Sequence, residues 1–419
     1  MVEISVILPV YNSEEYLEEC LNALVNQTFE DIEILCINDG SKDNSLDILK
    51  DFEKKDKRVK VFDQENVGVA RTRNNALKKV NGNYVYFMDS DDYLELDALE
   101  KLYNNVTNND SDFCLFRTYA VDKNQVRREL GAFNLDQKFQ DVDFNNFTFN
   151  CLDVKEYVLN DLFAPWFKLY KKEFLFSDED FVFPETASYS DTPFHVKTML
   201  KASKISFVPE FLYNYRFNPN SLVHNTSNTN YIFTIIDIIE DYLKKNDFFD
   251  TFKDEFYAFK ITKLVFYAGF SDSEEYYLKA KEELEPLKGF ADKVEPRYAE
   301  KMDIILESDN PRECYFDVNM HDAEYRIEHL QNSYDSLKTS YNTIKFKYNA
   351  LKERHAALQD KYNALKENYI SVKEKYSAMK TRYIALKHSN QVLKDENEAF
   401  RTSTSWQITK PLRKISGKK

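Results

Sequence analysis

Short apolar runs alternate with segments of helical periodicity over the first 120 residues of the chain. The runs predict buried strands, and apolar residues recurring every three to four positions predict helices. The expected strands are 4–10, 32–37, 59–62, 84–88 and 113–116, and the expected helices are 13–25, with Ser13 as its cap, 45–54 and 68–80. Strands that alternate with helices of this length predict an α/β fold with a doubly wound sheet.

An acidic group follows the expected strand 84–88. It consists of Asp89, Asp91 and Asp92. Ligands of open α/β sheets bind beyond the carboxyl ends of the strands, and carboxylate oxygens suit Mg²⁺ or Mn²⁺. The sequence therefore predicts a metal at this edge of the sheet, ready to take a phosphate. The alternative is an acidic turn before a helix whose first residues favour negative charge.

Two common nucleotide-binding motifs are missing. Neither the dinucleotide fingerprint GxGxxG nor the Walker A sequence GxxxxGK[ST] occurs, which argues against a dehydrogenase and a P-loop ATPase. Glycine is scarce, yet three of the seven glycines, Gly40, Gly68 and Gly82, fall in or beside expected loops. This placement indicates positions where the backbone conformation requires glycine.

Four segments closely resemble, in order and spacing, the successive motifs of family 2 glycosyltransferases of the GT-A fold. They are ILPVYN at 7–12, NDGSKD at 38–43, NVG at 66–68 with RN at 73–74, and DSDD at 89–92. The resemblance implies a GT-A doubly wound mixed sheet, which is Rossmann-like, and a nucleotide-sugar donor. It covers roughly the first 100 residues.

The resemblance places the base of the donor against three residues. Pro9 and Tyr11 would line the base pocket, with the Tyr11 ring offering a stacking or edge contact. Asp39 would accept a hydrogen bond from the base, typically from N3–H of uracil. The alternative for Asp39 is a residue of an ordinary Asp-Gly turn.

Three further residues would face the ribose and the diphosphate. Arg73 would meet the phosphates or the base, since its planar fork suits oxygen acceptors, or it would be a solvated helix arginine. Asp89 would contact the ribose or bridge to the metal. Asp91 would bind the metal, which grips the diphosphate. Arg71 either adds positive charge near the phosphates or points to water.

The candidate general base lies further along the chain. Segment 183–194 resembles the family's second acidic motif, with Ser190 in place of the usual Glu while Asp191 and Phe194 are kept. Sugar transfer needs a base for the acceptor hydroxyl, and Asp191 is the candidate, unless it only caps a helix. His195, expected on a helix surface, and His224, expected in a loop, are other conceivable bases.

Two segments beside these motifs carry less chemistry. Residues 121–150 are polar, rich in Asn and Phe and poorly periodic. They either shape the acceptor site or form a mobile loop without a role. Trp166 is equally suited to the core and to stacking on a sugar.

The last third of the chain changes pattern. Residues 231–308 predict amphipathic helices, and ten unbroken heptads then predict a coiled coil. The a positions carry mostly Tyr from Tyr334 to Asn397, and the d positions carry mostly Leu from Leu330 to Leu393. We expect a homo-oligomer, although Tyr at a favours either an oligomer other than a tight dimer or a heteromeric partner. A long single solvated helix is the alternative.

Composition limits the partners and the compartment. The net charge of −14 argues against a nucleic-acid partner. Five cysteines without CxxC spacing predict neither a disulfide framework nor a zinc site, and they fit a reducing compartment. No signal pattern and no apolar run of membrane-spanning length occurs, so we expect a cytoplasmic protein. The basic tail is either a peripheral contact with the inner face of the cell membrane or a disordered end.

These expectations combine into one domain plan. It comprises a catalytic domain at 1–225, a helical appendage at 226–320, a coiled coil at 327–398 and a basic tail at 399–419. The expected activity is the transfer of a sugar from a nucleotide diphosphate sugar, with UDP-sugar as the preferred donor, to a hydroxyl of a surface glycan or of its lipid-linked precursor. The transfer is expected to depend on a metal and to invert the anomeric configuration. The alternatives are a catalytically inactive domain serving as a coiled-coil tether and, less favoured by the sequence at 9–12, a nucleotidyltransferase.

Overall fold

The computed structural model describes residues 2–130, 134–159, 163–186, 188–216 and 229–403. His224 and nearly all of the expected basic tail therefore lie outside the described residues. The chain forms two compact units, Met1–Tyr325 and Arg326–Lys419.

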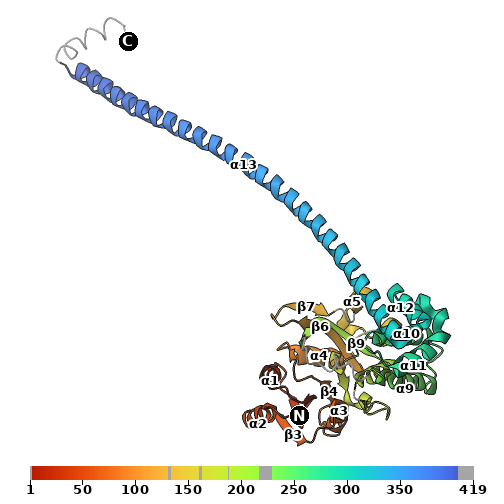
Figure 1. Ribbon diagram of the computed structural model, residues 1–419. Coiled ribbons are helices and arrows are strands. Elements are labelled where there is room, and N and C mark those ends of the chain that lie inside the picture. Colours follow the sequence, from red (N-terminus) through yellow and green to blue (C-terminus); the bar gives the residue numbers. More distant parts are fainter. Residues whose placement is uncertain (1, 131–133, 160–162, 187, 217–228, 404–419) are drawn as a thin grey trace. The chain divides into compact units, whose positions relative to one another are not determined.

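The first unit is built on one mixed sheet with the strand order β3-β2-β1-β4-β8-β6-β9-β5, and β7 pairs with β6 (Figure 1). Its strands are β1 (Ile4–Val10), β2 (Ile32–Asp39), β3 (Val59–Gln64), β4 (Tyr84–Phe87), β5 (Tyr93–Leu94), β6 (Phe113–Val121), β7 (Arg127–Leu130), β8 (Lys168–Lys171) and β9 (Ile205–Arg216). Strands β3, β2, β1 and β4 run parallel, whereas β8 is antiparallel to both β4 and β6. The predicted doubly wound mixed sheet is confirmed.

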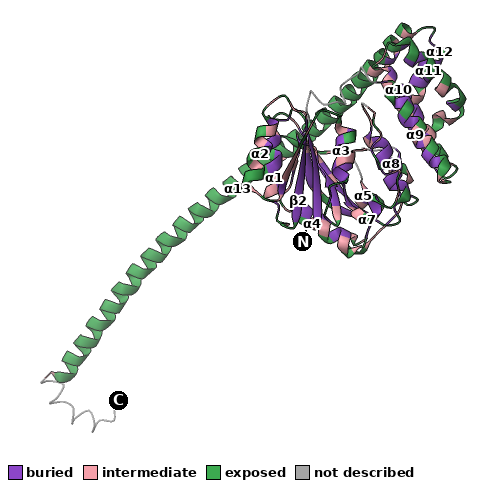
Figure 2. Ribbon diagram, turned by 90° about the horizontal axis from the view of Figure 1, so that it is seen from below, coloured by how far each residue is buried: buried purple, intermediate pink, exposed green. Residues whose placement is uncertain are grey.

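Helices cover both faces of this sheet (Figure 2). They are α1 (Leu17–Val25), α2 (Ser45–Lys55), α3 (Val69–Leu77), α4 (Ala98–Asn108) and α8 (Asp191–Lys201), with the short helices α5 (Leu135–Lys138), α6 (Lys155–Val158) and α7 (Lys172–Leu175). Helices α1 and α2 lie on one side and α3 on the other. Every residue of β1 and β2 is buried, which explains why these strands are almost continuously apolar.

One expectation about local structure needs correction. Helix α1 begins at Leu17 after Tyr16, without a side-chain cap, so Ser13 is not its cap. The Ser13 hydroxyl instead lies 2.6 Å from the hydroxyl of Ser90.

Within 121–150, Phe144 in the 3₁₀ turn η1 (Phe144–Asn146) packs edge-on against Phe207 of β9. The described part of this segment is therefore joined to the sheet by an aromatic contact.

From Tyr231 onward the first unit consists mainly of helices, as expected (Figure 1). It contains α9 (Tyr231–Lys245), α10 (Lys253–Ala268), α11 (Glu274–Leu284), the 3₁₀ turn η5 (Glu285–Lys293), α12 (Pro296–Glu307) and the start of α13 (Pro311–Thr402). Cys314 and Val318 of α13 are buried, and Asn319 donates a hydrogen bond to the carbonyl of Gly269.

In the second unit, α13 continues as one helix to Thr402, and its heptad residues are exposed (Figure 2). The long helix is confirmed, while its pairing into a coiled coil stays a prediction. Among the residues that the structure describes, no helix is both long enough and apolar enough to cross a membrane.

Candidate active site

The carboxyl ends of four parallel strands meet at one edge of the sheet. Ile7 of β1 pairs with Phe87 of β4, so Pro9 and Asp89, each two residues further on, leave the sheet at neighbouring points. On the other side of β1, Val10 pairs with Asn38, which places Asp39 at the same edge. The strand order reverses between β1 and β4, and such switch points are where open α/β sheets bind ligands.

Arg73 joins two of the predicted site residues. From α3 it donates one hydrogen bond to Asp89, at 2.7 Å, and one to Asp191 at the start of α8, at 2.6 Å. The arginine side chain is only 3% exposed, whereas about a third of each carboxylate side chain remains open to solvent. The structure thus brings one guanidinium and two carboxylates from distant parts of the chain together, with the acids facing solvent.

Charge and burial compete within this cluster. Burial raises the pKa of Asp191, Arg73 opposes the rise, and the neighbouring Asp89 adds to it. For Arg73, burial works against the charge, but Asp191 and Asp89 outweigh burial and raise its pKa above the usual value. Arg73 therefore stays charged, and Asp191 holds a proton more readily than a free aspartate does.

The alternative of Asp191 as a helix cap does not fit the geometry. Ser190 occupies the N-cap position of α8, and Asp191 is the first residue inside the helix. An aspartate there is favoured by the helix dipole. At this position the Asp191 carboxylate still accepts the hydrogen bond from Arg73.

Asp39 holds the loop between β3 and α3. Its two oxygens accept hydrogen bonds from the backbone N–H groups of Val67 and Gly68, both at 2.9 Å, and one oxygen also accepts from Gln64. Gly68 has a φ of 86° and Gly40 has a φ of 71°, which is the left-handed region that favours glycine. The predicted contact of Asp39 with a base would add to this role.

The expected metal residues supply carboxylate oxygens, which are suitable donors for Mg²⁺ or Mn²⁺. Asp91 follows Asp89 by two residues in the same loop and is partly exposed. Within the described ranges, no group of three acidic, His or Cys side chains is placed to hold a cation. The metal site at Asp91 therefore stays a prediction. Tyr11 is 51% exposed, so its ring is accessible at the same edge.

Sequence reasoning missed the role of Asp92. This carboxylate is 1% exposed and accepts hydrogen bonds from the Tyr213 hydroxyl, at 2.6 Å, and from the backbone N–H of Arg216, at 2.7 Å. Burial, followed by the charges of Asp91 and Asp89, raises its pKa well above the usual value. Asp92 therefore anchors the acidic loop to β9.

Asn74 has a comparable positioning role. Its side-chain amide donates to the carbonyl of Phe183 and accepts from the N–H of the same residue, at 2.8 and 3.0 Å. This pair of bonds fastens α3 to the segment that precedes Asp191. Asn74 belongs to the RN motif at 73–74, but the sequence assigned it no role, because its partner is 109 residues away.

Three other residues were uncertain from sequence, and each is tied into the protein. His195 was expected on a helix surface, but it is buried, with 1% of the residue exposed. Burial lowers its pKa well below the usual value. Trp166 is 3% exposed and stacks on Tyr213 with ring centroids 4.4 Å apart, so it belongs to the core. Arg71 forms an exposed ion pair with Glu185.

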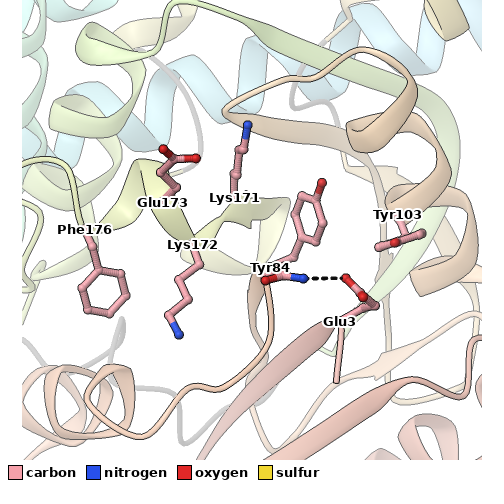
Figure 3. A pocket seen from close by; sticks show the side chains of 8 residues that line it. Glu3, Tyr84, Tyr103, Lys171, Lys172, Glu173 and Phe176 are labelled. Atoms are coloured by element: carbon pink, nitrogen blue, oxygen red, sulfur yellow. Dashed lines mark hydrogen bonds between the residues drawn. The ribbon is translucent and has the colours of Figure 1, made fainter. Parts of the chain in front are cut away.

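A pocket of about 500 Å³ lies at the opposite end of the sheet (Figure 3). It is lined by Glu3, Asn83, Tyr84, Tyr103, Lys171, Lys172, Glu173 and Phe176. Glu3 and Asn83 precede β1 and β4, whereas the acidic cluster follows them. The pocket therefore contains none of the predicted site residues.

Comparisons with known proteins identify the family of the chain. Residues 5–176 match the family described as Glycosyl transferase family 2. The glycosyltransferase GlyG of Streptococcus pneumoniae is 31% identical over 243 residues, which cover 58% of this chain and 79% of GlyG. The poly(ribitol-phosphate) beta-glucosyltransferase of Bacillus spizizenii is 35% identical over 219 residues, covering 51% of this chain and 32% of that enzyme.

A solved structure shares the fold. The crystal structure of S. aureus TarS 1-349 in complex with UDP-GlcNAc superposes with a TM-score of 0.55 and 25% identity, covering 78% of this chain and 92% of that one. The chain spans only 31% and 62% of the length of two further curated relatives, a glycosyltransferase of S. pneumoniae and one of Bacillus subtilis.

Proposed function

Because this chain belongs to glycosyltransferase family 2, we propose that it transfers a sugar from a UDP-sugar to a hydroxyl of a surface glycan or its lipid-linked precursor. The observation that carries the proposal is the cluster in which Arg73 holds Asp89 and Asp191 beside Asp91. The UDP-GlcNAc bound by TarS supports the donor, and the name of the Bacillus spizizenii enzyme supports a surface polymer as acceptor.

The donor would lie across the switch point between β1 and β4. Pro9, Tyr11 and Asp39 would contact the base, while Asp89 would meet the ribose. Asp91 would hold Mg²⁺ or Mn²⁺, which when bound neutralises negative charge on the departing diphosphate.

Asp191 would act as the general base. Its carboxylate would accept the proton of the acceptor hydroxyl while the hydroxyl oxygen bonds to the anomeric carbon. The bond between that carbon and the diphosphate oxygen breaks in the same displacement, which inverts the anomeric configuration. Arg73 keeps the Asp191 carboxylate in place and limits the rise in its pKa, which favours the ionised form that accepts the proton.

The inactive tether remains the alternative function, since Ser190 replaces a residue that the family usually has as Glu. The solvent-facing carboxylates of Asp89 and Asp191 favour an enzyme, because an inactive domain has no need to keep a buried arginine between two acids. We further propose that the protein works on the cytoplasmic side, in an assembly formed through α13 and with peripheral contact to the membrane. In the described residues all five cysteines are buried and free, which fits a reducing compartment.

A donor screen tests the proposal. Binding and hydrolysis of UDP-, GDP- and dTDP-sugars would be measured with Mg²⁺, Mn²⁺ or EDTA for the wild type and for Asp91→Ala. Asp241→Ala, on the exposed face of α9, is the matched control. We expect one donor class to bind in the presence of metal, and this binding to be lost in Asp91→Ala but not in the control. A folded wild type that binds no donor would support the tether instead.

A further inference from the structure

The second unit exposes a long apolar stripe. Leu337, Leu351 and Leu365 at heptad d positions are 65 to 69% exposed, and Tyr362 and Tyr369 at a positions are 60 and 66% exposed. Burial of such side chains is favourable, and a regular stripe of them on one helix marks a surface that meets a partner.

Basic residues border this stripe on both sides. Eight of the nine e positions from 338 to 394 are lysine, and Gln359 is the exception. Five of the nine g positions from 340 to 396 are Lys or Arg, and Glu396 is the one acidic residue among them. By contrast, five of the nine f positions from 339 to 395, on the opposite side of the helix, are Asp or Glu.

This distribution of charge is unfavourable for a second copy of the chain. In a parallel coiled coil, g residues of one helix face e residues of the other, so Lys347 and Arg354 would face the lysines of the second copy. In an antiparallel pair, e faces e and g faces g, which also places like charges together. The acidic f residues point away from the seam in both arrangements and cannot compensate.

A flat anionic membrane would attract the basic residues at e and g, but it does not match the geometry of the heptad repeat. A straight α-helix with a strict seven-residue repeat rotates its apolar stripe by about 20° per heptad. Over the seven heptads from Tyr341 to Ser389 the stripe would turn by roughly 140°, away from any planar surface. A second helix can follow the stripe by supercoiling.

We propose that residues 334–397 pair with a helix of a different protein, whose heptads carry Asp or Glu at e and g. The acidic flanks would neutralise the lysines that disfavour self-association, and the partner's apolar residues would cover the Leu and Tyr stripe. This specificity comes from charge as well as from apolar contact. The inference does not depend on transferase activity.

Two synthetic peptides serve as probes. Both have seven heptads with Ile at a and Leu at d; one carries Glu at all e and g positions, and the other carries Lys there. Binding of each labelled peptide to the full chain would be followed by fluorescence anisotropy at low and high salt. Analytical ultracentrifugation of the full chain alone would report self-association.

We expect the chain alone to stay monomeric and to bind the Glu peptide at least tenfold more tightly than the Lys peptide, with the difference shrinking as salt rises. The combined variant Lys366→Glu, Lys373→Glu, Lys380→Glu and Lys387→Glu should reduce this preference, because four of the thirteen basic residues at e and g then carry the opposite charge. Charge reversal at the f positions, Glu353→Lys, Asp360→Lys, Glu367→Lys and Glu374→Lys, should not.

Other outcomes would overturn the proposal. These are a stable dimer of the wild type alone, equal affinity for the two peptides, or no binding of the Glu peptide by a helical chain. Binding to phosphatidylglycerol–phosphatidylcholine vesicles without binding of the Glu peptide would assign the face to a membrane instead.

Discussion

The two ends of the parallel strands use carboxylates in opposite ways. At the amino end, Glu33 of β2 is 1% exposed and accepts hydrogen bonds from Ser5, Asn81 and Lys60. At the carboxyl end, Asp89 and Asp191 share one arginine and remain partly open to solvent.

The pKa values express the same difference. Burial would raise the pKa of Glu33, but bonds from Lys60, Ser5 and Asn81 outweigh it and lower the pKa. The pKa of Asp191 is raised instead, because one guanidinium does not compensate for burial and a second carboxylate. An acid whose bonding capacity is used within the protein stabilises the fold. An acid whose charge is incompletely balanced is available for a ligand or a proton.

The largest effect is expected at the carboxyl end. Asp191→Asn keeps the shape of the side chain but cannot accept a proton, so transfer should fall by about 10² to 10⁴-fold. Donor binding should change little, because the proposed donor contacts lie elsewhere. Product formation and donor titration would be measured together, with Asp241→Asn as control. Full transfer by Asp191→Asn would remove this residue from the mechanism.

Arg73→Lys should also reduce transfer, but by less than Asp191→Asn. Lysine keeps the charge but cannot donate to Asp89 and Asp191 from one planar group, so transfer should fall by about 10²-fold. With weaker compensation the pKa of Asp191 should rise further, which moves the acidic limb of the kcat/KM profile to higher pH. A reduced rate with an unshifted profile would indicate a packing role for Arg73 alone.

At the amino end, Glu33→Gln should affect stability and leave the activity of the folded protein unchanged. Loss of the charge-assisted bonds should cost about 1–3 kcal/mol of unfolding free energy at neutral pH. Because the folded pKa is lowered, this contribution is full above the unfolded pKa, about 4.3, and is lost as pH falls through the folded value. Denaturant unfolding at several pH values measures it, and an equal loss at all pH values would contradict the assignment.

Asp92→Asn tests the buried acid of the loop at 89–92. Its raised pKa means that the folded protein keeps a proton that the unfolded chain has released, so wild-type stability falls as pH rises between the two pKa values. Asparagine does not titrate. The unfolding free energy of the variant should therefore rise relative to that of the wild type by up to about 1.4 kcal/mol for each unit of pH increase within that window. A stability difference independent of pH would show that Asp92 is ionised in the fold.

Sequence patterns predicted the sheet and the gathering of the motif residues at one of its edges, because each depends on local periodicity and on short motifs. They did not distinguish Asp92 from Asp89 and Asp91, since the three acids are neighbours in sequence. Tyr213 makes the difference, and it lies 121 residues further along the chain.

His195 was misplaced for a similar reason. Helices with a polar residue usually expose it, but nine of the eleven residues of α8 are buried. Periodicity reports a buried face only when another face is exposed, so a helix covered on nearly all sides gives no such signal.

Hydrogen–deuterium exchange with UDP-sugar and Mg²⁺ would most directly test which end of the sheet is the active site. We predict protection at the carboxyl ends of β1 and β2 with the turns that follow them, at the connection from β3 into α3, and at the loop after β4. These are residues 9–13, 38–42, 65–73 and 89–92. No protection is expected around Glu33, or at Glu3, Asn83 and Lys171 in the pocket of Figure 3. Protection at that pocket, with none at the acidic loop, would contradict the account.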